Sequence, residues 1–173
     1  MKRTLLTLLA GLSAVAIASS ALASDLRMTR ERPWQFLTTK GDVFSPPSKI
    51  IHGLSLADGQ VRGLVTLRQD YGTWRIAITD TNSYHCPNVY IDGNVHVMVW
   101  LSSTNQVYET KWEVRGAGKQ VETIGDDGDA LVKALLASSR AVFRVIDGCD
   151  SSVDYEVENI NLQEEFASFE RAR

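Results

Sequence analysis

Three histidines are the residues of this sequence best suited to bind a metal or act as a base: His52, His85 and His96. Only His85 and His96 lie close enough in sequence for one hairpin to join them. Between them stands Asp92-Gly93, a dipeptide typical of a type I′ turn. Pairing about that turn opposes Val89 to His96, which leaves His85 about four residues out of step. We therefore predict that the histidines do not share a metal site.

Other motifs of catalytic or ligand-binding type are incomplete. Gly118-Lys119 resembles the end of a phosphate loop, but glutamine follows the lysine and the required earlier glycine is missing. Asp126, Asp127 and Asp129 offer oxygen ligands for calcium, yet their spacing does not match a calcium loop and favours helix capping. The G-x-S-x-G motif of a serine nucleophile does not occur. We predict that the protein is not an enzyme and uses neither metal nor cofactor.

The sequence contains two cysteines, Cys86 and Cys149. Residues 1–23 have the features of a signal peptide, and in an exported chain two cysteines most often form one disulfide, so we predict that bond here. The alternative is a reactive thiol or a metal ligand, because His85 stands beside Cys86. Adjacent residues of a strand point to opposite faces, however, so His85 is badly placed to activate the Cys86 thiol.

Tryptophans are the most prominent candidates for binding: Trp34, Trp74, Trp100 and Trp112. Trp74 and Trp112 alternate in phase with aliphatic residues, which indicates that both point into the core. Trp100 instead shares a strand face with His96 and Met98. This face combines a large aromatic anchor with a flexible thioether, which suits protein contacts. We predict a partner contact at His96, Met98 and Trp100, together with Asp92 of the nearby turn.

A second use of that face stays open. Leu162, Phe166 and Phe169 mark one side of a predicted C-terminal helix. If its two phenylalanines pack on the face that carries Trp100, the face is part of the core and binds no partner.

The predicted elements are mostly short strands. Alternating apolar and polar residues, separated by turn sequences, indicate strands near residues 34–37, 50–51, 61–67, 74–79, 95–101, 107–114, 119–124, 141–146 and 153–160. Helical spacing appears only at residues 130–137 and 162–169. This pattern predicts a mainly β fold: an antiparallel β-sandwich or barrel of about eight short strands, with two short helices near the C-terminus.

Residues 1–23 have the features of a signal peptide: Lys2 and Arg3, an apolar run, and Ala21-Leu22-Ala23 before the predicted cut. Residues 24–173 then form a single β-rich domain, in which 16 basic residues face 21 acidic ones. An acidic domain without a basic stretch is a poor candidate for nucleic-acid binding. We predict a protein of the periplasm or the secreted fraction, with no stable membrane insertion after signal cleavage.

Several of these features resemble a known group of exported bacterial β-proteins. Gly72-Thr73-Trp74 before a strand, Cys86, Cys149 and the ending Asn161-Leu162-x-x-x-Phe166-Ala167 are similar to the invasion-associated locus B family. Periplasmic accessory proteins of type VI secretion clusters are similarly built. The resemblance spans residues 72–172 and implies a small exported β-domain, and it implies no catalytic residues.

The predicted function is therefore non-catalytic. We predict an exported envelope or secreted protein that binds a protein of the bacterial envelope or of a host. One alternative is a periplasmic inhibitor or immunity protein that blocks a hydrolase, for which a small acidic domain with a disulfide is well suited. Another is a carbohydrate-binding module, because aromatic side chains stack on sugar rings.

Overall fold

The computed structural model describes residues 28–40, 47–80, 82–88, 92–125, 127–159 and 161–171, so the predicted signal peptide lies outside the described residues. Within them, the elements follow in this order: β1 (Trp34–Thr38), β2 (Lys49–Ala57), β3 (Gln60–Asp70), β4 (Thr73–Asp80), β5 (Asn94–Leu101), β6 (Gln106–Arg115), the 3-10 turn η2 (Gly116–Gly118), β7 (Gln120–Thr123), α2 (Asp127–Leu136), β8 (Arg140–Ile146), β9 (Ser152–Glu158) and α3 (Leu162–Arg171). None of the described helices has the length and apolar character that a membrane-spanning helix needs.

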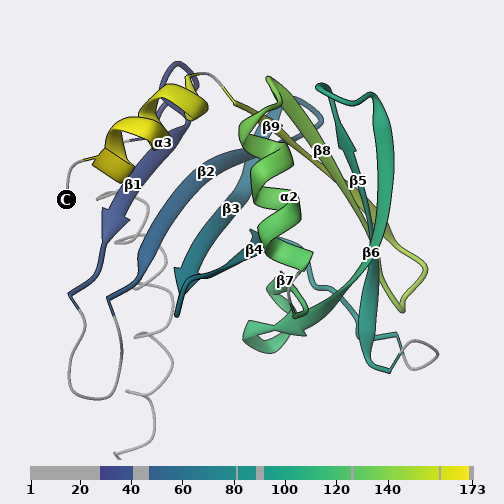
Figure 1. Cartoon of the computed structure of the whole chain (residues 1–173). Coiled ribbons are helices and arrows are strands. Elements are labelled where there is room, and N and C mark those ends of the chain that lie inside the picture. Colours follow the sequence, from purple (N-terminus) through teal and green to yellow (C-terminus); the bar gives the residue numbers. More distant parts are fainter. Residues whose placement is uncertain are drawn as a thin grey trace, which may run out of the picture.

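One antiparallel sheet contains the nine strands in the order β1-β2-β3-β4-β7-β6-β5-β8-β9. A further pairing, of Leu56 in β2 with Glu156 in β9, joins the two ends of the eight strands β2 to β9. The result is a closed barrel with β1 as an extra edge strand (Figure 1). The predicted antiparallel β fold is confirmed, and of its two forms the protein adopts the barrel.

Alternate residues of each strand fill the barrel, because successive side chains of a strand point to opposite faces. An eight-stranded barrel has an interior just wide enough for side chains to fill. Its largest fully buried residues are Trp112, Tyr155, Phe143, Ile51, Leu67, Ile76, Ile78 and Leu101. Trp112 and Phe143 lie with ring centroids 5.9 Å apart. Trp112 is thus a core residue, as its alternation with aliphatic neighbours predicted, whereas Trp74 is only half-buried at the margin of the core.

The strand β7 is too short to fill the space between its neighbours. It pairs only with residues 77–79 of β4 and with residues 112–115 of β6. Residues 73–76 of β4 and residues 106–111 of β6 therefore have no strand between them. Figure 1 shows α2 lying across this part of the barrel.

Two aspartates in the first turn of α2 attach it to both strands. The Trp74 amide of β4 donates to Asp129 Oδ1 over 2.7 Å, and the Thr110 hydroxyl of β6 donates to Asp127 Oδ2 over 3.1 Å. Gly128 allows this close approach, because a Cβ there would lie 2.0 Å from the Trp74 carbonyl oxygen. The aspartates that were expected at the start of this helix are therefore also its connection to the barrel.

The turn at Asp92-Gly93 has the expected conformation but not the expected register. Both residues have positive φ, 58° and 78°, as that dipeptide favours. The pairing that the structure shows beside the turn joins Asn88 to Asn94, whereas the predicted register opposes Asn94 to Ile91. The prediction of a tight two-residue hairpin is therefore wrong. The pairing of Asn88 with Asn94 closes a longer loop, in which residues 89–91 lie outside the described residues.

Candidate functional site

Strand β5 divides its side chains between the core and the surface. Val95, Val97, Val99 and Leu101 are buried, whereas the alternate residues His96, Met98 and Trp100 are half-buried and point out of the barrel. We call these three residues the β5 strip. The outward phase that sequence periodicity predicted for Trp100 is what the structure shows.

Neighbouring strands extend the β5 strip on both sides. Strand β6 places Val107 opposite Trp100 and Glu109 opposite Met98. Strand β8 adds Val142 opposite Trp100 on the other side. Val107 is 52% exposed, so the apolar surface is open to solvent next to the indole of Trp100. The result is a row of three apolar side chains across three strands.

Polar groups hold the margins of this surface. The Trp100 indole N–H donates to Asn105 Oδ1 over 3.2 Å, which satisfies the only polar atom of that side chain. His96 Nε2 lies 3.6 Å from Glu109 Oε2. Arg144, on β8 beside Met98, makes two hydrogen bonds of 2.7 Å to Asp154. An apolar centre with a charged margin is the usual arrangement of a protein-binding surface.

The C-terminal helix does not cover the β5 strip. Phe166 of α3 packs on Trp74, with ring centroids 5.7 Å apart, and Phe169 packs on Phe36 at 5.3 Å. Figure 1 shows α3 beside β1, while β5 lies on the other side of the molecule. The alternative in which Phe166 and Phe169 bury the face of Trp100 is therefore wrong. The fourth predicted contact residue, Asp92, is exposed in the turn before β5.

A second group of polar residues lies inside one end of the barrel and was not identified from the sequence. Its centre is Asp80, the last residue of β4, which is completely buried. Asp80 Oδ2 accepts hydrogen bonds from Arg62 Nε at 2.8 Å and from the Tyr155 hydroxyl at 2.9 Å. Asp80 Oδ1 accepts from the amides of Asn82 and Ser83 at 2.7 and 3.0 Å. The carboxylate is thus fully satisfied by four donors.

His85 joins this network from the loop that follows β4. Its Nε2 lies 3.2 Å from the Tyr155 hydroxyl oxygen, and its side chain is almost completely buried. Because the Tyr155 hydroxyl donates its proton to Asp80, His85 Nε2 carries a hydrogen and donates to the Tyr155 oxygen. His85 is therefore a packed structural residue, while His96 is on the outside of the barrel.

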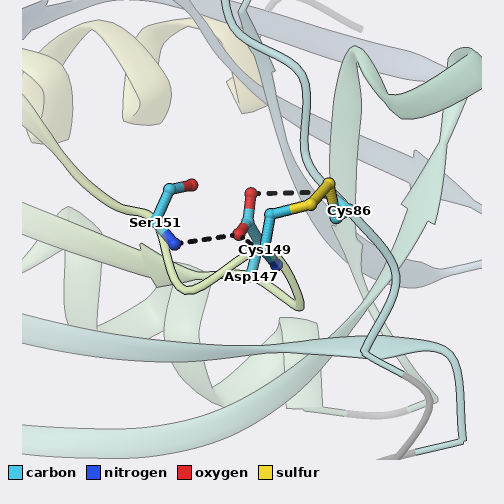
Figure 2. Close-up of a disulfide and its surroundings, with 4 residues drawn as sticks. All are labelled: Cys86, Asp147, Cys149 and Ser151. Atoms are coloured by element: carbon cyan, nitrogen blue, oxygen red, sulfur yellow. Dashed lines mark hydrogen bonds between the residues drawn. A yellow bond between two sulfur atoms is a disulfide. The ribbon is translucent and has the colours of Figure 1, made fainter.

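The disulfide lies next to this network, and the predicted bond between Cys86 and Cys149 is confirmed. Asp147 connects the two cysteines: its carboxylate accepts from the amide of Cys86 at 3.3 Å and from the amide of Cys149 at 2.9 Å (Figure 2). The Ser151 amide donates to the same carboxylate at 3.2 Å. Asp147 and the disulfide together hold the loop of residues 82–88 against the turn between β8 and β9.

Burial and hydrogen bonding set the charges of these groups. Burial lowers the pKa of His85, against the opposing effect of Asp147 and Asp80, so the imidazole is neutral at pH 7. Burial acts to raise the pKa of Asp80, but hydrogen bonds from Asn82, Tyr155, Ser83 and Arg62 hold it below its ordinary value. The pKa of Asp147 is likewise lowered, because hydrogen bonds from the loop outweigh its burial.

These shifts predict that the protein loses stability in acid in two stages. Unfolded His85 takes a proton below its ordinary pKa of 6.5, whereas folded His85 takes one only at lower pH, so the free energy of unfolding falls as the pH drops below about 6.5. His52, whose pKa burial also lowers, adds to this stage. A second loss begins near the ordinary aspartate pKa of 3.8 and continues through the lowered values of Asp80 and Asp147.

Urea unfolding between pH 5 and 8 measures the first stage. His85→Gln should reduce the dependence of the free energy of unfolding on pH in that range. The matched control is Val107→Gln, which places the same amide at an exposed position of β6 and removes no titratable group, so it should leave the dependence unchanged. Equal pH profiles for the natural protein and His85→Gln would contradict the role of the buried imidazole.

One sequence signal could have revealed the buried network. Asp80 stands in phase with the inward residues Ile76 and Ile78, and an acidic residue at an inward position needs buried hydrogen-bond partners. The same alternation places Tyr155 inward between Val153 and Val157. The alternation could not show that Tyr155 would meet Asp80, or that His85 would join them from an irregular loop.

The remaining candidates do not form a metal site among the described residues, in which no cluster of three or more His, Cys, Asp or Glu side chains is arranged to hold a metal ion. Asp127 and Asp129 are engaged with β6 and β4, and Asp126 lies outside the described residues.

Comparison with known proteins identifies no relative. No protein-family model matches the chain, and neither a curated protein nor a solved structure shows significant similarity to it.

Proposed function

We propose that this protein is an exported, non-catalytic envelope or secreted protein that binds a protein partner through the β5 strip. The observation that carries this proposal is the open apolar surface around Trp100, which neither α2 nor α3 covers. Both helices pack elsewhere: α2 on β4 and β6, and α3 on Trp74 and Phe36.

Export is supported by two independent features of the chain. The first 23 residues have the sequence of a signal peptide. The Cys86–Cys149 disulfide is of the kind that persists in the periplasm and outside the cell, where thiols become oxidised. Together they favour the periplasm or the secreted fraction as the place where the protein works.

The chemistry of the β5 strip supports a protein as its ligand. Tryptophan is among the residues that contribute most to binding energy, and methionine adapts its shape to an opposing surface. Trp100 presents its ring while its indole N–H is already bonded to Asn105, so binding need not leave that group unpaired. The acidic domain also attracts a basic partner at long range, and this attraction weakens as salt rises.

A pair of variants tests the proposal. Met98→Glu/Trp100→Ala introduces a charge and removes the aromatic anchor at outward positions, so the variant should still fold. We expect it to recover a partner from an envelope extract at least about tenfold less well than the natural mature protein, the usual effect of losing a binding anchor.

Val61→Glu is the matched control, because Val61 is an exposed valine of β3 and lies outside the β5 strip. It should recover the partner as the natural protein does, and circular dichroism should show that both variants are folded. Equal recovery by the double variant and the control would exclude the β5 strip as the binding surface.

The inhibitor or immunity function is the second candidate, and one observation favours it. Tyr71 lies at the tip of the β3–β4 hairpin and is 82% exposed, which is the kind of aromatic projection that can enter an enzyme cleft. Tyr71→Ala would then abolish binding while the double variant of the β5 strip would not. The same set of variants therefore distinguishes the two functions.

A further inference from the structure

The strand β1 is not needed to close the barrel, and this gives it an unusual position. Its one strand neighbour among the described residues is β2, and its other edge has no strand beside it. Strand β1 lies on the left of Figure 1 and β5 on the right, so this edge is separate from the β5 strip.

The hydrogen bonds around β1 show which of its backbone groups face the free edge. The Thr39 amide donates to the Ser48 carbonyl, and the Leu54 amide donates to the Pro33 carbonyl, both at 2.9 Å. In an antiparallel pair, bonded and non-bonded residue pairs alternate. Positions 33 and 39 are bonded to β2, so positions 35 and 37 between them are bonded as well. Trp34, Phe36 and Thr38 therefore direct their N–H and C=O groups away from β2, toward the free edge.

The free edge lacks several of the features that normally protect an edge strand. The segment Trp34–Thr38 contains no charged residue and no proline, and its pairing with β2 runs without a bulge. Leu37, on the outer face, is 37% exposed. Helix α3 contacts the inner face through Phe169 and Phe36, which leaves the backbone edge itself uncovered by that contact.

The strand is also held firmly in place. Trp34 is buried, and its indole N–H donates to the carbonyl of Glu158 at the end of β9, over 3.1 Å. The Trp34 ring lies directly over Gly53, where a Cβ would be 2.4 Å from the ring. An edge that is fixed in an extended conformation loses little entropy when another strand pairs with it.

Charges at the two ends of β1 indicate the kind of strand that would pair there. Arg32 precedes it and Lys40 follows it, and both are exposed. Arg30 and Glu31 also precede it, but the Arg30 guanidinium donates to the Gly59 carbonyl in the turn between β2 and β3. An antiparallel pair of two copies centred on Phe36 would oppose Arg32 to Lys40 of the second copy. Like charges in opposing positions are unfavourable, so a second copy is a poor occupant.

We propose that the free edge of β1 binds an extended segment of a protein partner by strand addition, and that this segment has acidic residues at both ends. Backbone hydrogen bonds to Trp34, Phe36 and Thr38 would supply affinity, and the flanking Arg32 and Lys40 would select the acidic ends. This proposal does not depend on the β5 strip.

The test uses the mature protein, residues 24–173, and two blocked nonapeptides of alternating threonine and valine. One peptide ends in two glutamates on each side and the other in two lysines. Amide hydrogen exchange, followed by NMR, should be fast at Phe36 and Thr38 and slow at Gln35 and Leu37 in the free protein. The glutamate peptide should slow exchange at Phe36 and Thr38 by at least about tenfold, and the lysine peptide should bind at least about tenfold more weakly.

Thr38→Pro and Thr38→Val form a matched pair of variants. Proline removes the Thr38 N–H, which faces the free edge, and therefore breaks no bond to β2, while valine keeps that N–H. Thr38→Pro should weaken binding of the glutamate peptide at least about tenfold, and Thr38→Val should not.

Equal binding by the two variants, or no protection by the glutamate peptide at millimolar concentration, would overturn the proposal. Protection that appears without peptide and grows with protein concentration would assign the edge to a second copy and would equally overturn it.

Discussion

Replacement of Asp80 by asparagine is expected to lower the free energy of unfolding by about 3–5 kcal/mol, the usual cost of removing one partner from a buried charged network. Each carboxylate oxygen of Asp80 accepts two hydrogen bonds. An amide has only one acceptor oxygen, so in either orientation its NH2 group faces two donors. The substitution also leaves the Arg62 guanidinium without its buried counter-ion.

Urea unfolding at pH 7 measures this loss, and Tyr155→Phe is the appropriate control. It removes one hydroxyl, which donates to Asp80 and accepts from His85 Nε2, and it leaves the Asp80 carboxylate and its other three donors in place, so it should cost less, about 1–3 kcal/mol. A loss for Asp80→Asn no larger than that for Tyr155→Phe would mean that the carboxylate acts as an ordinary hydrogen-bond acceptor and not as the centre of the network.

Local patterns were sufficient to predict most of the strands. In β6 and β9, charged residues alternate with apolar ones, and each strand has one buried and one exposed face, so the period of two is visible in the sequence. The orientation of Trp100 follows from the same period in β5. This is why the β5 strip could be named from the sequence alone.

The closure of the sheet could not be predicted in the same way. It depends on Leu56 meeting Glu156, one hundred residues later, and on β7 entering between β4 and β6. Such pairings are non-local and leave no periodic signal, because a sandwich and a barrel use the same alternation of residues. For the same reason, the sequence could not show whether Phe166 would pack on Trp100 or, as the structure shows, on Trp74.

The register of the turn at Asp92-Gly93 was predicted wrongly because a local preference met a stronger constraint. The dipeptide favours a two-residue turn. The disulfide and Asp147, however, fix the loop of residues 82–88 to the turn between β8 and β9. This places Asn88, at the end of that loop, where it pairs with Asn94. A covalent bond between distant residues outweighs a turn preference of this size.

Removal of the disulfide by Cys86→Ser/Cys149→Ser is expected to lower the free energy of unfolding by about 4 kcal/mol. The bond joins residues 63 positions apart, and closing a loop of that length removes much of the entropy of the unfolded chain. The amides of both cysteines also bond to Asp147, which without the crosslink must hold the loop alone. Unfolding in urea, with and without a reductant, measures the difference.

Asp147→Asn separates the crosslink from the hydrogen bonds beside it. It keeps the disulfide but weakens the acceptor for the amides of Cys86, Cys149 and Ser151, so it should cost less, about 1–3 kcal/mol. Reductant should destabilise Asp147→Asn further and should not change the double serine variant, which has no disulfide left to reduce. A double serine variant as stable as the natural protein would show that the hydrogen bonds, and not the crosslink, hold the loop of residues 82–88 in place.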